Sequence, residues 1–207
     1  MSPFSKRRSS QRGPSQGDGR NQLRIIGGKW RGRKLDFPKI EGLRPTGDRI
    51  RETLFNWLAA EIPGANCLDL FSGSGALGFE ALSRGASKAV MIEHSANAYQ
   101  LLCAHRERLS AENAEIIHTT AEQWLLQANH EFQDGQDYFD LVFIDPPFQL
   151  NWLERNSALL ADSKLFHPGS LIYLEQGSDQ GLKLPPKWRP IKQKQAGQVA
   201  YGLYQQA

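Results

Sequence analysis

The segment NCLDLFSGSGALGFEAL, residues 66–82, runs from an apolar strand candidate through a glycine-rich turn into a helix candidate. Gly73, Gly75 and Gly78 match the pattern G-x-G-x-x-G, and the helix is expected to begin near Ala76. Glycines let backbone N–H groups approach a ligand closely, and a helix N-terminus adds partial positive charge. This segment predicts a cofactor-binding turn in an α/β sheet.

A second strand candidate, residues 88–93, ends at Glu93, 18 residues after Gly75. An acid at this position typically accepts hydrogen bonds from ribose hydroxyls. Together, the turn and Glu93 indicate an adenosine-containing cofactor without identifying which one. The structural alternative is a glycine-rich turn followed by a surface glutamate.

Downstream of the turn, strand and helix candidates alternate. The strand candidates are apolar nearly throughout, as expected for a parallel sheet covered by helices on both faces. A final pair of segments, 188–195 and 198–205, predicts an antiparallel hairpin turning at Ala196-Gly197. The predicted fold is therefore α/β, a Rossmann-like doubly wound sheet of seven strands ending in that hairpin. The other strands are expected at 66–71, 88–93, 114–119, 139–145 and 170–176, and the helices near 76–84, 95–110, 121–129 and 151–162.

Upstream of the turn, residues 23–37 predict two short strands around Gly27-Gly28. A helix is expected over residues 47–61, with Thr46 as a cap and Pro63-Gly64 as the end. Residues 1–20 hold too few large apolar groups to offset their ordering entropy and are expected to be disordered.

Charge is distributed unevenly along the 207 residues. Residues 1–51 carry 14 Lys/Arg against 4 Asp/Glu, whereas the rest carry 11 against 18. A basic arm on an acidic body is typical of nucleic-acid binding, and the alternative is a solvated tail. The two cysteines lack metal-ligand spacing, and no apolar run approaches the ~20 residues of a membrane helix. A reducing cytoplasm is the expected location.

The motif DPPF, residues 145–148, follows the fourth strand candidate. Its prolines lack N–H groups and stiffen the loop, which leaves the Asp145 side chain and fixed carbonyls as hydrogen-bond acceptors. Phe148 adds a flat apolar surface. Such a loop suits a planar base with an exocyclic amino group, because the acceptors bind the amino hydrogens while the ring stacks. The alternative is a turn that merely ends the strand.

These motifs, in this order and spacing, resemble the S-adenosylmethionine-dependent methyltransferases of the Rossmann-like class, in which an Asp/Asn-Pro-Pro-aromatic motif marks amino-group methylation. The flanking text is similar to the bacterial 16S ribosomal RNA guanine-N(2) methyltransferases, the RsmD family. The similarity extends over about residues 23–205 and is carried by RIIGGKWRGRKL, GLRPTGDRIRETLFNWL, ALGFEALSRGA and AGQVAYGLY.

The resemblance implies methyl transfer from S-adenosylmethionine to N2 of a guanine in 16S rRNA, bound free or within a 30S or assembling particle. It implies three parts of the chain: a disordered basic tail (1–22), an RNA-binding hairpin and helix (23–62) and a methyltransferase domain (63–207). Asp145, Pro146 and Phe148 would hold the guanine. The implied cofactor contacts are Asp69, Phe71, Ser72, Gly73, Gly75, Glu93, Thr120 and Ala121.

RNA contacts are expected from the basic block around Trp30, whose indole would offer a stacking surface: Lys29, Trp30, Arg31, Arg33 and Lys34. The alternative is that Trp30 packs onto the domain. Arg44, Thr46 and Arg49 are implied either to contact RNA or to close over the cofactor, and the sequence leaves both roles open. No residue spacing indicates a metal, and a monomer is expected.

Three other functions fit part of this pattern. A DNA amino-methyltransferase would share both motifs but usually needs a separate recognition domain. A small-molecule methyltransferase would not explain DPPF or the basic arm. A non-catalytic RNA-binding module would leave the acceptor loop unexplained.

Overall fold

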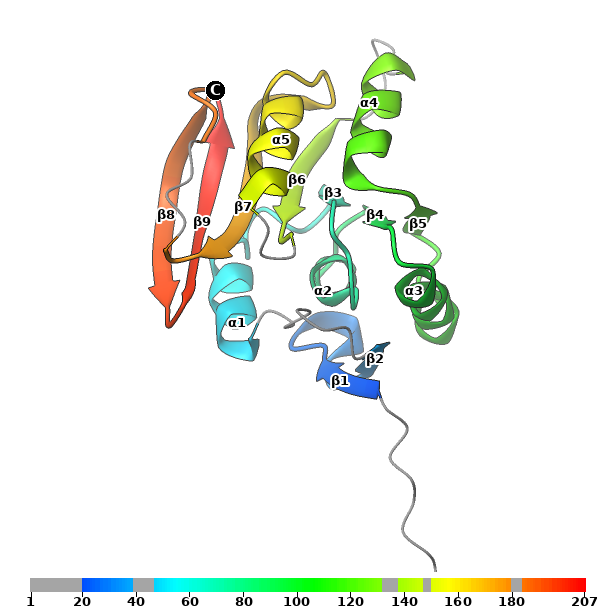
Figure 1. Cartoon of the computed structure of the whole chain (residues 1–207). Coiled ribbons are helices and arrows are strands. Elements are labelled where there is room, and N and C mark those ends of the chain that lie inside the picture. The colour runs from blue at the N-terminus through cyan, green and yellow to red at the C-terminus, as the bar shows by residue number, and fades with distance from the viewer. Residues whose placement is uncertain (1–19, 39–46, 132–137, 147–149, 180–183) are drawn as a thin grey trace, which may run out of the picture.

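The computed structural model describes residues 20–38, 47–131, 138–146, 150–179 and 184–207. Its main sheet has seven strands: β3 (Asn66–Asp69), β4 (Lys88–Glu93), β5 (Ala114–His118), β6 (Phe139–Ile144), β7 (Phe166–Gly177), β8 (Trp188–Ala196) and β9 (Val199–Gln206). The strand order is β5-β4-β3-β6-β7-β9-β8 (Figure 1). Neighbours from β5 to β7 are parallel, whereas β9 is antiparallel to both β7 and β8. The doubly wound sheet with a C-terminal hairpin, predicted from the sequence, is confirmed.

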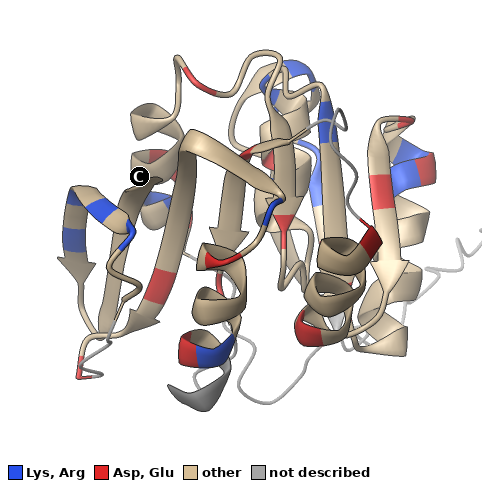
Figure 2. Ribbon diagram, turned by 90° about the horizontal axis from the view of Figure 1, so that it is seen from above, with Lys and Arg blue, Asp and Glu red and all other residues tan. Residues whose placement is uncertain are grey.

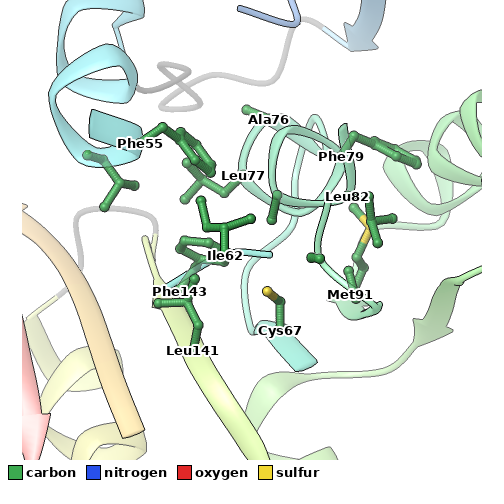
Figure 3. Close-up of a cluster of buried hydrophobic side chains, with 14 of the residues drawn as sticks. Phe55, Ile62, Cys67, Ala76, Leu77, Phe79, Leu82, Met91, Leu141 and Phe143 are labelled. Atoms are coloured by element: carbon green, nitrogen blue, oxygen red, sulfur yellow. The ribbon is translucent and has the colours of Figure 1, made fainter. Parts of the chain in front are cut away.

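Helices cover both faces of this sheet, which is why its central strands are apolar on both sides. One face packs against α1 (Asp48–Trp57), α2 (Ala76–Ser83) and α3 (Ala96–Leu109). The other packs against α4 (Ala121–Glu131) and α5 (Leu150–Ala161). Figure 3 shows part of the first of these two cores, where Phe55 of α1 lies beside Phe143 of β6, their ring centres 6.1 Å apart. Phe79 of α2 lies on the side of its helix that faces α3, where it meets the ring of His105. Within the described ranges, no helix combines the length and apolar character needed to span a bilayer.

The N-terminal segment forms a separate two-stranded sheet, β1 (Arg20–Arg24) with β2 (Lys34–Pro38), around a short 3-10 helix, η1 (Gly28–Trp30). Strand β1 therefore includes residues 20–22, which the sequence assigned to the tail. The buried side chains of this hairpin, such as Leu35 and Phe37, belong to the same core as α1 and α2. The hairpin is thus packed on the main sheet's helical layer instead of standing apart from it (Figure 1).

Two boundaries differ by four residues from the sequence prediction, and the other boundaries of the main domain differ by two or fewer. Helix α1 ends at Trp57, four residues before the predicted end, and the chain continues in hydrogen-bonded turns in which Glu61 N–H and Ile62 N–H both donate to Leu58 O (3.0 and 3.1 Å) and Ile62 is buried. The residue before the first turn of α1 is Gly47, and the predicted cap Thr46 lies outside the described residues. Strand β7 begins at Phe166, four residues before the predicted start.

Candidate active site

The two sequence motifs meet at the carboxyl ends of adjacent parallel strands. Strand β3, which leads into the glycine turn, lies between β4 and β6, with Asp69 aligned to Met91 on one side and Phe143 on the other. Glu93 is the last residue of β4, and Asp145 directly follows β6. Ligands of open α/β sheets bind at this edge, so the topology brings the predicted cofactor and substrate residues together.

The glycine turn is held by its own backbone. Gly75 N–H donates to Ser72 O at 2.6 Å, and the Ser72 hydroxyl donates to Asp69 O at 3.0 Å. Gly73 and Gly75 have φ angles of 49° and 77°, which are left-handed values that favour glycine. A Cβ on Gly75 would lie 2.5 Å from the ring of Phe79, so this glycine also allows α2 to pack closely.

Glu93 is fastened to the glycine turn. One carboxylate oxygen accepts Gly73 N–H at 2.8 Å and the other accepts Ser95 N–H at 2.7 Å, while the side chain is only 6% exposed. Each oxygen keeps a second lone pair for another donor. The contact fixes the position of the acid relative to the turn.

Asp69 is a buried carboxyl group in the middle of this edge. Burial raises its pKa to about 7, against the hydrogen bond that its Oδ2 accepts from Gly78 N–H at 3.1 Å. The negative charges of Asp145 and Glu93 also raise this pKa. Asp145 follows β6, the parallel neighbour of β3, so the two motifs leave the sheet at the same edge.

Asp145 is partly buried and Pro146 is buried, whereas Phe148 lies outside the described residues. On the other side of β6, the hydroxyl of Tyr173 in β7 donates to Glu175 Oε1 at 2.7 Å. Burial raises the pKa of Tyr173 well above its usual value, and Glu175 and Asp145 raise it further. Asp145 therefore lies between the β3 and β7 side chains.

Strand β5 ends beside Glu93. Glu93 aligns with His118, and Thr119 N–H donates to Glu93 O at 3.2 Å. Thr120 precedes α4, and its hydroxyl accepts Gln123 N–H at 3.2 Å, as a helix-capping residue does. Ala121 is buried. Phe71 is partly buried against the second core. Every described residue that was implied for the cofactor thus lies at this edge or within one turn of it.

The N-terminal basic block has exposed cations but a buried tryptophan. Lys29, Arg31 and Arg33 are exposed. Trp30 is not exposed: the residue is 9% exposed and lies in the core, with the Lys29 ammonium over its ring. The backbone N–H of Trp30 donates to Ser83 Oγ at 2.9 Å. The prediction of a stacking surface at Trp30 is therefore wrong, because the apolar ring fills the contact between hairpin and helix. The predicted RNA contacts Arg44 and Thr46 lie outside the described residues.

One anchor was missed by the sequence reasoning. Glu80, fully buried in α2, accepts N–H bonds from Ile26 (2.7 Å) and Gly27 (2.8 Å), and Arg84 Nε donates to it at 2.6 Å. The available signal was a lone charge inside the apolar helix ALGFEALS. Among the described residues, no group of three or more His, Cys, Asp or Glu side chains could hold a metal ion.

Comparison with known proteins agrees with this geometry. The chain is 48% identical over 188 residues to ribosomal RNA small subunit methyltransferase D of Escherichia coli (strain K12), covering 90% of this chain and 91% of the relative. It is 45% identical over 188 residues to the protein of that name from Haemophilus influenzae, covering 90% and 95%.

Solved structures give the same result. The Escherichia coli protein yhhF matches with a TM-score of 0.79 and 48% identity over 90% of this chain and 98% of that one. A more distant neighbour, the 16S rRNA methyltransferase RsmC of Thermus thermophilus, shares the fold with a TM-score of 0.65 at 18% identity, covering 91% of this chain and 50% of that one. The model of the family Conserved hypothetical protein 95 matches residues 23–205. The chain therefore belongs to this family, the RsmD family of methyltransferases.

Proposed function

We propose that this methyltransferase transfers a methyl group from S-adenosylmethionine to the exocyclic N2 of a guanine in 16S rRNA. The observation that carries the proposal is the pairing of β3 with β6 as parallel neighbours, which puts Asp145, the start of DPPF, at the same sheet edge as Asp69 and the glycine turn. The names of the relatives support ribosomal RNA as the substrate. RsmC, solved with AdoMet and guanosine, has the same fold.

The described residues fit the proposed cofactor in their chemistry. Glu93, fixed by the Gly73 and Ser95 N–H groups, would accept hydrogen bonds from ribose hydroxyls. Asp69, whose pKa is raised to about 7 in this structure, would be favoured as a carboxylate when a cationic group lies near it. Thr120 and Ala121 would border the adenine. When bound, S-adenosylmethionine supplies a methyl group made electrophilic by a positively charged sulfur.

The substrate side depends on acceptors. The lone pair of a guanine amino group is delocalised into the ring, which makes the nitrogen a poor nucleophile. Hydrogen bonds from the amino group to the Asp145 carboxylate and the Pro146 carbonyl would favour a pyramidal nitrogen and stabilise its developing positive charge. Asp145 or water would then take the proton. Phe148 is proposed to stack on the base.

Access for RNA is proposed along the exposed cations of the N-terminal segment, Lys29, Arg31 and Arg33. Contacts from these side chains to phosphates would position the substrate without reading its sequence. A guanine within structured RNA must be unpaired or flipped out before it can reach Asp145. The cytoplasm and a monomeric enzyme remain part of the proposal.

The test is methyl transfer from tritium-labelled S-adenosylmethionine to naked 16S rRNA, 30S particles and duplex DNA, followed by digestion to nucleosides. Label in 2-methylguanosine from rRNA is the expected result. Label in DNA, or in another nucleoside, would overturn the proposal, and RNA retention without label in any arm would favour a binding module.

The role of Asp145 has its own test. Asp145→Ala removes the acceptor and is expected to lower kcat by about 10²–10³-fold, as the loss of one transition-state hydrogen-bonding group does in other enzymes. Affinity for S-adenosylmethionine should stay within a few fold, measured by titration calorimetry. The control is Asp162→Ala, an exposed carboxylate after α5. Full activity of Asp145→Ala would remove this residue from the mechanism.

A further inference from the structure

The C-terminal hairpin carries a concentration of positive charge that the proposed function has not used. Residues 187–207 hold four cations, Lys187, Arg189, Lys192 and Lys194, and no Asp or Glu. Residues 52–186 carry 7 Lys/Arg against 18 Asp/Glu, so this hairpin is a basic element on an acidic body. All four cations are exposed, and the positive positions on the hairpin are visible in Figure 2.

Strand register places two of these lysines level with the candidate active site. Across the sheet, Phe143 aligns with Tyr173, Leu203 and Lys192 in turn. Two residues further along β7, Glu175 aligns with Tyr201 of β9, which in turn aligns with Lys194 of β8. Asp145, two residues after Phe143, is at that second level. Because β8 runs parallel to β6 and β7, Lys194 lies toward the same edge of the sheet, three strand spacings or about 14–15 Å from β6.

The two lysines also lie on the face of the sheet that α1 covers, the face that carries Tyr173 and Tyr201. Their ammonium groups are each 5.8 Å from the ring centre of Trp57, which is partly exposed on α1. Trp57 stacks on Tyr201 at 5.6 Å, and Tyr201 lies 6.5 Å from Tyr173. Aromatic rings therefore connect the lysines to the Tyr173 side chain, whose pKa Asp145 influences.

We infer that Lys192 and Lys194 bind the phosphate backbone of the rRNA strand beside the target guanine, a role that rests on the proposed function. The charge of the hairpin is complementary to phosphate, and the edge strand β8 leaves both ammonium groups accessible. Trp57 lies within cation–π distance of both ammonium groups. A strand entering at Asp145 needs such a contact, because a flipped nucleotide is positioned by the backbone on either side of it.

The experiment compares two variants that lose the same charge: Lys192→Gln/Lys194→Gln, and as a control Lys88→Gln/Lys164→Gln. Lys88 and Lys164 lie at the amino ends of β4 and β7, the opposite edge of the sheet. Dissociation constants for a 16S rRNA fragment are measured over a range of salt concentrations. Two lost phosphate contacts should reduce the slope of log K against log salt by about 1.4–1.8 in the β8 variant, and by much less in the control.

Methylation kinetics give the second measurement. The β8 variant should show a KM for RNA raised about tenfold, with kcat at saturating RNA and affinity for S-adenosylmethionine close to wild type. Equal salt slopes and equal KM values in the two double variants would overturn the inference. Failure of the wild-type protein to methylate rRNA would instead overturn the proposed function. Thermal unfolding of both variants identifies any loss of folding.

Discussion

Two buried acids, Glu80 within helix α2 and Asp69, which accepts an N–H from the same helix, have opposite surroundings. Glu80 accepts two backbone N–H groups from the N-terminal hairpin and the Arg84 guanidinium. Asp69 accepts Gly78 N–H, lies near two further carboxylates, and is absent from the ion pairs among the described residues. The first acid has a cation and two N–H donors as partners, whereas the second lies near other acids and has a pKa raised to about 7.

This difference distinguishes an acid that holds the fold together from one that we propose serves a site. A buried charge is costly unless it is paired, and strongly perturbed acids are concentrated at functional sites. The Glu80 network fixes the hairpin on α2. The acids at the carboxyl edge, Asp69, Glu93 and Asp145, are those proposed for the cofactor and the substrate. Each side of the comparison makes a different prediction for loss of its acid.

The largest expected effect is on Glu80→Ala. Removing this carboxylate leaves Arg84 and two hairpin N–H groups without their partner, and breaking a buried ion pair from one side typically costs about 3–5 kcal/mol. Urea unfolding monitored by tryptophan fluorescence measures the change. Glu80→Gln keeps the shape and one acceptor, so its loss should be smaller. A change below about 1 kcal/mol for the alanine variant would show that the network does not stabilise the fold.

A smaller loss is expected for Ser83→Ala at the same contact. The Ser83 hydroxyl accepts Trp30 N–H at 2.9 Å and donates to Gly27 O at 2.6 Å. Leaving buried backbone groups unsatisfied costs about 1–3 kcal/mol. The same urea titration gives the value, and Ser163→Ala, in a partly buried turn elsewhere, serves as the comparison. Equal stability of the Ser83 variant and wild type would contradict the assignment.

Asp69→Asn is expected to make the protein more stable relative to wild type as the pH rises, the opposite of the loss expected for the Glu80 variant. Because folding raises the pKa of Asp69 from 3.8 to about 7, the stability contributed by its protonated form is full below pH 3.8 and is lost as the pH rises through about 7. The asparagine variant does not ionise. Its Tm relative to wild type should therefore increase between about pH 5 and pH 8, by at least the ~2–4 °C that corresponds to about 1 kcal/mol at this chain length.

Differential scanning calorimetry at both pH values tests this prediction, with Asp162→Asn as an exposed control. The control should show no pH-dependent difference from wild type. If the Asp69 variant loses stability equally at both pH values, the carboxylate is compensated after all, and the contrast with Glu80 disappears.

Much of the fold was predictable because its signals are local. Apolar runs of strand length, the glycine turn and the Ala196-Gly197 turn each specify their own element, and the parallel topology aligns Glu93 and Asp145 without further information. The end of α1 was missed because the apolar spacing continues into the turns after Trp57, and periodicity does not distinguish such turns from helix. The family resemblance, not periodicity, supplied the residue roles.

The failures concern contacts between distant residues. Trp30 reads as a surface aromatic among cations, yet its partner Ser83 is 53 positions away. Glu80 reads as a helix residue, yet it binds backbone groups 53 and 54 positions upstream. In both cases the residues next to Trp30 or Glu80 in the sequence give no indication of the distant partner. The pKa of Asp69 likewise depends on Asp145 and Glu93, which only the folded sheet brings near.

The long separation between hairpin and anchor has a consequence for synthesis of the chain. The hairpin leaves the ribosome first, but it cannot dock until Glu80 and Ser83 have followed, nor can Asp36 O meet the ring of His105 (2.7 Å) until α3 is out. Domains emerge N-terminal end first at about 5–20 residues per second, so the apolar side of the hairpin waits several seconds for its helix. The earliest part of this protein to be made is thus among the later parts to fold.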